Sequence, residues 1–239
     1  MKTLLHLCGC ALLAFAGIAT AAPATTADQI LDRYIAACGG SENLSRIRNR
    51  VMEAKISSGI LSLKVKTQLV WPNLWDEQGS LLGIAAGSGH DGSTAWTIKG
   101  SDITVVQGKE FRRLLRGHSL DWHKQIRQWY PTRRLLPDAV VDGSKVQVLE
   151  MIADTGDREV WRFDAATGLL RQLESIKQED DPDEPPVMII SNLGDYRQVD
   201  GVTLAFRITG TEGRKKFSLD MLSLVNNGKV EAPRFPAKK

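Results

Sequence analysis

The stretch that decides the fold runs from residue 192 to residue 208 and reads NLGDYRQVDGVTLAFRI. Its Asp200-Gly201 pair lies between two runs of alternating apolar residues, which is the strongest short-range signal for a β-hairpin. The favoured two-residue turns need a positive φ, and glycine adopts it without strain. The stretch therefore predicts two antiparallel strands. One face of the second strand carries Val202, Leu204, Phe206 and Ile208.

A second long strand is predicted over residues 61–71, where apolar and polar side chains alternate. Lysines occupy even positions, so the strand has one wet face, as in an antiparallel sheet that covers a core with its other face. The apolar face carries Leu61, Leu63, Val65, Leu69 and Trp71. Further strands are expected at residues 51–57, 74–78, 95–98, 103–106, 146–152, 159–163, 169–177, 187–193 and 217–225.

Two parts of the chain have helical periodicity. Thr26 and Gln29 form a capping-box pattern at the start of an apolar stripe, and residues 41–47 follow as a short helix. Between residues 109 and 130 the apolar positions again recur at helical spacing, with a predicted break at Gly117. An amphipathic helix needs a surface that covers its apolar stripe, and the sheet supplies that surface.

Together these elements predict an α+β protein built on a single large antiparallel β-sheet of about ten strands, with an N-terminal helix and a mid-chain helical insertion. A sheet of that size tends to curl. The helices must then cover its apolar concave face, and any uncovered part of that face forms an apolar cavity. No linker divides residues 22–239, so one domain is expected.

The N-terminus has the pattern of a secretory signal peptide. Lys2 precedes an apolar run at residues 4–18, and Ala-Thr-Ala at residues 19–21 forms a cleavage site. Removal of residues 1–21 leaves Cys38 as the cysteine of the mature chain, so an internal disulfide is excluded and a buried thiol is expected. A lipid anchor at Cys10 is the alternative, but the residues before it match a lipoprotein signal only loosely.

The charge balance excludes some partners. Without Lys2 the chain has 30 Lys and Arg against 28 Asp and Glu, which argues against a nucleic-acid binder. No stretch after the signal peptide reaches 18 consecutive apolar residues, so a soluble mature protein is predicted.

Most catalytic signals are absent from the sequence. It has no G-x-S-x-G, C-x-x-C or H-E-x-x-H motif, and neither an enzyme nor a cofactor or metal centre is predicted. His118 and His123 fall on different helix faces, which disfavours a metal site, and the acidic run at residues 179–184 is interpreted as a solvated loop. A hydrolase is a distant alternative. Its sign would be a Ser or Asp within hydrogen-bond reach of His90, His118 or His123.

The helical insertion is strongly basic, with eight Lys or Arg and two Asp or Glu between residues 109 and 134. In one interpretation its charged side faces water while its aromatic residues fill the core. In the other it meets anionic lipid headgroups or an acidic partner, while Trp122 and Trp129 contact an apolar group. The residues that would bind the partner or membrane are Arg112, Arg113, Arg116, Lys124 and Arg127.

Several of these features together resemble a known family. The signal peptide, an opening helix at residues 30–40 (ILDRYIAACGG), a strand meander and GDYRQVDGV at residues 194–202 resemble the LolA/LolB-like outer-membrane lipoprotein-sorting proteins of bacterial envelopes. Residues 163–170 (FDAATGLL) resemble the strand–turn–strand before the Asp-Tyr hairpin of that family. The resemblance extends over most of the mature chain.

The resemblance implies an unclosed β-barrel, or strongly curved sheet, lined with apolar side chains and plugged by helices. It also implies a periplasmic protein that shields the acyl chains of a lipoprotein or lipid, with an inner- or outer-membrane protein as a further partner. A monomer is expected. No functional residue of the family can be transferred by motif, so the cavity lining is inferred from strand alternation and from the two tryptophans of the insertion. These lining residues are Leu61, Leu63, Val65, Leu69, Trp71, Trp122, Trp129, Leu204, Phe206 and Ile208.

Two functions are therefore compared. The leading hypothesis is a soluble periplasmic carrier or chaperone that binds acyl chains without catalysis. The alternative is a non-enzymatic envelope interaction module whose sheet is fully packed and whose basic helix binds a protein partner or an anionic membrane. A cavity beneath Trp122 and Trp129 would favour the carrier, and a filled space would favour the module.

Overall fold

The computed structural model describes residues 25–177, 185–230 and 233. The predicted signal peptide at residues 1–21 and the acidic run at residues 179–184 lie outside the described residues. Within them the helices are α1 (Ala27–Ala37), α2 (Gly40–Arg46), α3 (Gly108–His118) and α4 (Trp122–Trp129).

The strands form one antiparallel sheet. They are β1 (Asn49–Ser58), β2 (Leu61–Val70), β3 (Leu74–Leu81), β4 (Ile84–His90), β5 (Ala95–Lys99), β6 (Asp102–Val106), β7 (Thr132–Val141), β8 (Ser144–Ile152), β9 (Arg158–Asp164), β10 (Leu170–Lys177), β11 (Val187–Val199), β12 (Val202–Glu212) and β13 (Lys215–Asn226). The 13 strands have the order β6-β5-β4-β3-β2-β1-β13-β12-β11-β10-β9-β8-β7.

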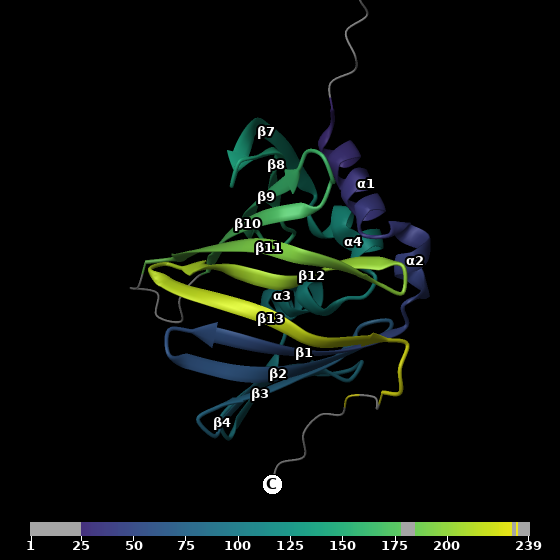
Figure 1. Ribbon diagram of the computed structural model, residues 1–239. Coiled ribbons are helices and arrows are strands. Elements are labelled where there is room, and N and C mark those ends of the chain that lie inside the picture. The colour runs from purple at the N-terminus through teal and green to yellow at the C-terminus, as the bar shows by residue number, and fades with distance from the viewer. Residues whose placement is uncertain (1–24, 178–184, 231–232, 234–239) are drawn as a thin grey trace, which may run out of the picture.

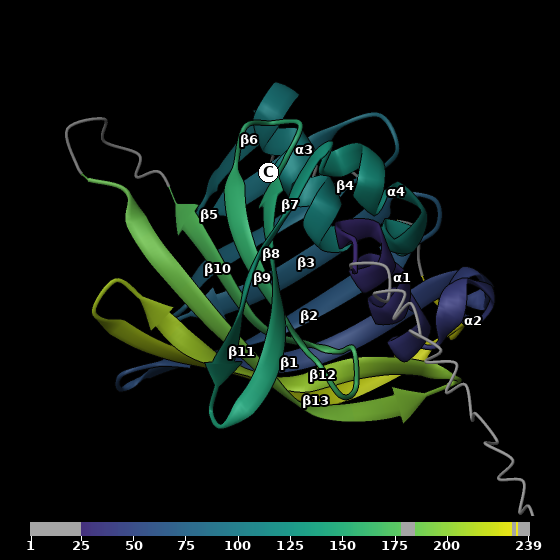
Figure 2. The same cartoon turned by 90° about the horizontal axis from the view of Figure 1, so that it is seen from above.

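The chain builds this sheet from the middle. Strands β1 to β6 run outward to one edge, α3 and α4 carry the chain to the opposite edge, and β7 to β13 return inward until β13 pairs with β1. The sheet is strongly curved, and α1, α3 and α4 lie inside the curve (Figures 1 and 2). Because β6 and β7 end the strand order, the barrel is not closed. The predicted α+β class and single curved antiparallel sheet are confirmed.

The expected number of about ten strands is wrong, and β4 is one of the strands that the pattern concealed. Its sequence IAAGSGH offers little apolar alternation, because glycine and alanine replace larger side chains. The packing explains one of these glycines. A Cβ added at Gly89 would lie 2.2 Å from Trp96 Cζ2, so the buried indole of Trp96 occupies the space that a side chain would need.

The other concealed strand is β7, which contains Pro137. Proline cannot donate to a strand ladder and is therefore confined to edge strands and bulges. β7 lies at the edge of the sheet, and its register with β8 shifts between Leu136 and Ala139, which places Pro137 at an irregularity. Pro137 would be unfavourable in a central strand, but it is compatible with this edge strand.

The hairpin at Asp200-Gly201 is confirmed. Val199 pairs with Val202, and the two turn residues have φ values of 52° and 79°, as the favoured hairpin turn requires. This turn also holds the helices, because the backbone N–H of Thr203 donates to the Cys38 carbonyl oxygen over 3.0 Å at the end of α1.

Helix α1 anchors the core. The predicted capping box is present, with Gln29 N–H donating to the Thr26 hydroxyl and Thr26 N–H donating to the Gln29 side chain. Ile30 and Leu31 are fully buried, and burial of such side chains stabilises the fold by roughly 1.5–3 kcal/mol each. Cys38 is also buried, and burial raises the pKa of its thiol to about 12. It is the buried thiol that the sequence predicts.

The predicted break of the insertion into two helices is confirmed, but it lies two residues after Gly117, because α3 continues to His118. The chain leaves the helix at Ser119, whose backbone is extended, and α4 begins at Trp122. None of the helices in the described ranges has the length and apolar character that crossing a bilayer requires.

Candidate functional site

The concave face of the sheet carries a continuous row of aliphatic side chains across β2, β1, β13, β12 and β11. The row follows the strand register: Leu63 pairs with Ile56, Ile56 with Leu219, Leu219 with Ile208, and Ile208 with Leu193. Directly paired residues of antiparallel strands point to the same face. Because Leu193 packs against the core beneath the helices, the row faces the concave side. Its side chains are only half-buried.

The opposite face of the same strands is charged. One residue along from the aliphatic row, Lys64 pairs with Lys55, Lys55 with Asp220, and Asp220 with Arg207. Arg207 and Asp220 also lie 3.6 Å apart as an exposed ion pair. Since a strand turns alternate side chains to opposite faces, the sheet separates an aliphatic concave surface from a wet convex one.

A second row extends the apolar surface toward the other half of the sheet. Phe217 pairs with Gly210, Gly210 with Ser191, and Ser191 with Leu173. A Cβ at Gly210 would lie 3.0 Å from Phe217 Cζ, so the glycine leaves room for the phenyl ring. Leu173 in turn lines a cavity. The concave surface therefore reaches that cavity by way of Gly210, Ser191 and Leu173.

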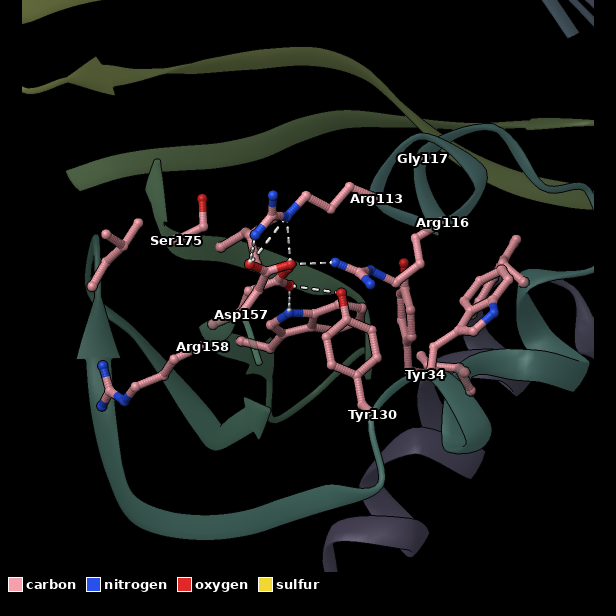
Figure 3. A pocket seen from close by; sticks show the side chains of 15 residues that line it. Tyr34, Arg113, Arg116, Gly117, Tyr130, Asp157, Arg158 and Ser175 are labelled. Atoms are coloured by element: carbon pink, nitrogen blue, oxygen red, sulfur yellow. Dashed lines mark hydrogen bonds and ion pairs between the residues drawn. The ribbon is translucent and has the colours of Figure 1, made fainter. Parts of the chain in front are cut away.

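The cavity has a volume of about 660 Å³ and lies between the sheet strands β9 and β10 and the helices α3 and α4 (Figure 3). No residue of helix α3 is fully buried, although Phe111, Leu114 and Leu115 pack against the core, whereas α4 buries His123, Ile126 and Trp129. The cavity is lined by Tyr34, Arg113, Arg116, Gly117, Trp122, Ile126, Trp129, Tyr130, Asp157, Arg158, Glu159, Trp161, Leu173, Ser175 and Ile176.

Aromatic rings form much of the cavity wall and are packed against one another. The ring of Tyr34 lies 5.3 Å from that of Trp122 and 6.4 Å from that of Trp161, where it makes an edge contact. Tyr130 makes a second edge contact with Trp161 at 5.4 Å. These spacings are those at which aromatic pairs attract, so the wall is a rigid apolar surface.

Glu159 projects among these rings. Its Oε2 atom accepts hydrogen bonds from the Tyr130 hydroxyl at 2.9 Å and from Trp161 Nε1 at 2.7 Å, as the dashed lines in Figure 3 show. Burial raises the pKa of the Glu159 carboxyl, although the two hydrogen bonds and the nearby Arg116 partly offset that effect. The apolar surroundings therefore disfavour the carboxylate charge.

Ion pairs connect α3 to the turn between β8 and β9. Arg113 Nη2 lies 2.6 Å from Asp157 Oδ1, and Arg116 Nη2 lies 2.8 Å from Asp157 Oδ2. Arg116 also donates to the Thr155 hydroxyl at 3.0 Å. The hydrogen bond from Arg113 is the main cause that holds the pKa of Asp157 far below its usual range. One carboxylate thus holds two arginines of the helix over the cavity (Figure 3).

The predicted lining residues of the second strand are spread along the concave face. Leu63 and Val65 are half-buried there, whereas Leu61 is 42% exposed near the β1–β2 turn. Leu69 is in the core, paired with Trp75. Trp71 lies beyond the end of β2, where its Nε1 donates to Asp121 and the guanidinium of Arg48 stacks 3.7 Å above its ring.

The remaining predicted lining residues are two tryptophans of α4 and three residues of β12. Trp122 and Trp129 border the cavity. Leu204 packs against the core, and Ile208 belongs to the aliphatic row. Phe206 is buried with the Arg197 guanidinium 4.6 Å from its ring centroid. The structure thus brings Trp122 and Trp129 together at the cavity and places the strand residues elsewhere on the sheet.

The basic residues predicted to meet a partner have acidic partners within the chain. Arg112 and Arg116 pair with Asp154, and Arg113 and Arg116 with Asp157. Lys124 pairs with Asp121 at 3.0 Å, while Arg127 pairs with Asp28 and Asp32 of α1. Binding of an external acidic partner by these side chains would have to compete with these contacts, and it stays a prediction.

A serine does lie within reach of a histidine. Ser45 Oγ is 3.1 Å from His123 Nε2 and ties α2 to α4. His123 is 3% exposed, and its Nδ1 is buried without a hydrogen-bond partner among the described residues. A catalytic Ser–His pair needs a third group to orient the imidazole and a cavity for substrate. Neither residue lines the cavity, so this contact is interpreted as structural.

Glu159, Asp157, Tyr34 and Trp161 belong to the cavity wall but were not identified from the sequence. A signal for two of them was present in β9, whose sequence is REVWRFD. Glu159, Trp161 and Phe163 occupy alternate positions and so share one face of β9, which places one carboxylate on an otherwise aromatic strand face. Tyr34 lies in α1, and Asp157 lies in the turn between β8 and β9, where sequence pattern alone indicates no cavity. Across the described ranges, no group of three His, Cys, Asp or Glu side chains could hold a metal ion.

The sequence and the structure of this chain were compared with those of known proteins. No family model matches the chain, and no curated protein matches it. Several solved structures, in contrast, match the fold of this chain. A putative outer membrane lipoprotein-sorting protein domain from Vibrio parahaemolyticus has a TM-score of 0.54 and 14% identity, covering 86% of this chain and 95% of that chain.

Two further solved structures give the same result. A LolA superfamily protein from Nitrosomonas europaea has a TM-score of 0.53 and 14% identity, covering 87% of this chain and 96% of that chain. A DUF1329 family protein from Desulfovibrio piger has a TM-score of 0.56 and 12% identity, covering 86% and 95%. Identities this low show the fold alone. The protein has a LolA-like fold.

Proposed function

We propose that this protein is a non-enzymatic periplasmic carrier that shields the acyl chain of a lipoprotein or lipid on the concave face of its sheet. The observation that carries this proposal is the half-buried aliphatic row from Leu63 to Leu193, which lies on the same concave face as the cavity lined by Leu173 and α4. Each chain methylene that leaves water for such a surface gains roughly 0.8 kcal/mol.

The fold neighbours and the N-terminal sequence support the same function. The Vibrio parahaemolyticus structure is described as a putative lipoprotein-sorting domain, which makes an acylated lipoprotein a reasonable cargo for a chain of the same fold. A cleaved signal peptide at residues 1–21 would deliver this chain to the periplasm. There the carrier would keep the acyl chain from water between the two membranes, and a membrane protein would load or receive it.

The cavity favours the carrier over a packed interaction module. A module requires a filled space beneath Trp122 and Trp129, whereas both residues border the 660 Å³ cavity. The ion pairs of Arg113 and Arg116 with Asp157 further reduce the charge that a basic helix could offer a partner.

Native mass spectrometry of the protein purified from its own envelope tests the proposal. We expect added masses that correspond to an acylated molecule and that disappear after extraction with organic solvent. As a control, protein refolded from denaturant without lipid should lack these masses and regain them on exposure to an envelope lipid extract. Absence of any adduct in both preparations would contradict the carrier function.

A further inference from the structure

The carboxylate of Glu159 has hydrogen-bonding capacity that the protein does not use. Its two donors, the Tyr130 hydroxyl and Trp161 Nε1, are both neutral and both reach Oε2. Among the described residues no hydrogen bond ends on Oε1, and no Lys, Arg or His of the described ranges forms an ion pair with Glu159. A half-buried carboxylate in an apolar wall is costly unless a donor or a positive charge compensates it.

The arginines of the cavity wall are already paired with other acids. Arg113 and Arg116 bind Asp157, and Arg158 lies 2.6 Å from Glu150. Arg116 is near enough to Glu159 to lower its pKa somewhat, but its hydrogen bonds go to Asp154, Thr155 and Asp157. Glu159 is thus the carboxylate of this wall that lacks a cation of its own.

The surroundings of Glu159 attract cations. The faces of aromatic rings carry negative potential, and a desolvated ammonium group is attracted to them. Five aromatic side chains line the same cavity as Glu159: Tyr34, Trp122, Trp129, Tyr130 and Trp161. The protein itself makes one such contact, with the Arg116 guanidinium 5.6 Å from the Tyr130 ring centroid.

We propose that this cavity binds a primary ammonium headgroup, of the ethanolamine type, that belongs to the same amphiphile whose chain lies along the aliphatic row. The inference rests on the proposed carrier function. A primary ammonium supplies the N–H donor that Glu159 Oε1 lacks, the aromatic wall stabilises its charge, and Leu173 joins the cavity to the apolar surface.

An anionic headgroup fits less well. It would meet the carboxylates of Asp157 and Glu159 in the wall, and it would have to displace Asp157 from both Arg113 and Arg116. The three arginines of the wall, Arg113, Arg116 and Arg158, are already paired with Asp154, Asp157 and Glu150. Among the described residues, the charge of the wall without an ion-pair partner is therefore that of Glu159, which favours a cation.

Binding of three dodecyl amphiphiles to the full mature chain, each below its micelle concentration, tests the headgroup. The probes are dodecylammonium, dodecyl maltoside and dodecyl sulfate, with ethanolamine as the headgroup without a chain. We expect dodecylammonium to bind about tenfold tighter than dodecyl maltoside, and ethanolamine alone to bind far more weakly than either. Glu159→Gln keeps the size and an acceptor, and it should remove the preference for dodecylammonium over dodecyl maltoside.

The matched control is Glu174→Gln on β10. Glu174 precedes Ser175 and therefore lies on the opposite face of the sheet, where it pairs with Arg162. This variant should keep the full preference for dodecylammonium. If Glu159→Gln fails to fold, acidification of the wild type gives a second measurement. Protonation of Glu159, which faces Arg116 and Asp157, should remove the preference while the amine stays charged.

The outcomes separate this inference from the carrier function. Equal affinities for the three dodecyl probes, or a preference for dodecyl sulfate, overturn the ammonium site and leave the carrier function standing. Ethanolamine binding as tightly as dodecylammonium also overturns it, because the ligand would then be a free amine. Failure of every dodecyl probe to bind overturns both proposals.

Discussion

At the scale of single residues, Asp157 ties α3 to the turn between β8 and β9. It binds Arg113, which is about half-exposed, and Arg116, whose side chain is 9% exposed. Phe111, Leu114 and Leu115 of α3 pack against the core while remaining partly exposed, so these ion pairs, together with Arg112–Asp154, add to a limited apolar contact. The pair with Arg116 contributes more to stability than the pair with Arg113, since an ion pair exposed to water contributes little.

Asp157→Asn should lower the free energy of unfolding by about 1–3 kcal/mol, because it leaves the nearly buried Arg116 with Asp154, at 3.3 Å, as its remaining carboxylate partner. Since the pKa of Asp157 is held below its usual 3.8, its contribution is complete above that pH and is lost as the pH falls further. Chemical denaturation at neutral pH measures the change. Asp195→Asn is the control, because Asp195 and its partner Arg197 are both exposed and no measurable change is expected.

Equal stabilities of the Asp157→Asn variant and the wild type would show that α3 is held by other contacts. A loss confined to strongly acidic pH would contradict the assignment as well, because the wild-type pair should be intact at neutral pH.

The residues of the site differ in how far the sequence could place them. Ile208 was predictable, because strand alternation after Asp200-Gly201 decides its face. Glu159 was predictable in principle from the alternation within β9. The pairing of Arg113 with Asp157 was not, since it joins residues 44 positions apart and depends on where α3 crosses the sheet.

At the scale of the elements, Gly89 allows β4 to pack closely against Trp96 of β5. The indole of Trp96 occupies the space above Gly89, and a methyl group there would lie 2.2 Å from the ring. A fully buried tryptophan cannot move away without displacing its own neighbours. The low alternation of β4 is therefore a consequence of its packing.

Gly89→Ala should lower the free energy of unfolding by about 1–3 kcal/mol through overpacking against Trp96. Gly194→Ala on β11 is the matched control. It has open space for a Cβ and a φ outside the left-handed region, so its stability should be unchanged or slightly increased. Thermal melts followed by circular dichroism compare the two variants, and an equal effect of both would contradict the role of Trp96.

Elements with strong local signals were predicted well, and those shaped by tertiary contacts were not. The α1 capping box and the Asp200-Gly201 turn depend on residues that are close in sequence, so the local pattern suffices. β7 carries Pro137, and only its position at the edge of the sheet makes that proline acceptable. Strand order is a property of the whole sheet and has no local signal.

For the whole molecule, the strand register has one main consequence. It places aliphatic side chains on the concave face and charged side chains on the convex face of the same central strands. The helices cover part of the concave face, and the cavity of about 660 Å³ remains between α3, α4 and the strands. The carrier hypothesis depends on that asymmetry between the two faces.

Binding of the uncharged fluorescent probe N-phenylnaphthylamine tests the central claim most directly, because two strands offer matched variants on opposite faces. Ile208→Gln with Leu219→Gln alters the concave row, and Arg207→Gln with Asp220→Gln alters the convex row beside it. The carrier account predicts that the concave variant loses about tenfold in affinity and that the convex variant binds like the wild type. A folded concave variant that binds the probe as tightly as the wild type would contradict it.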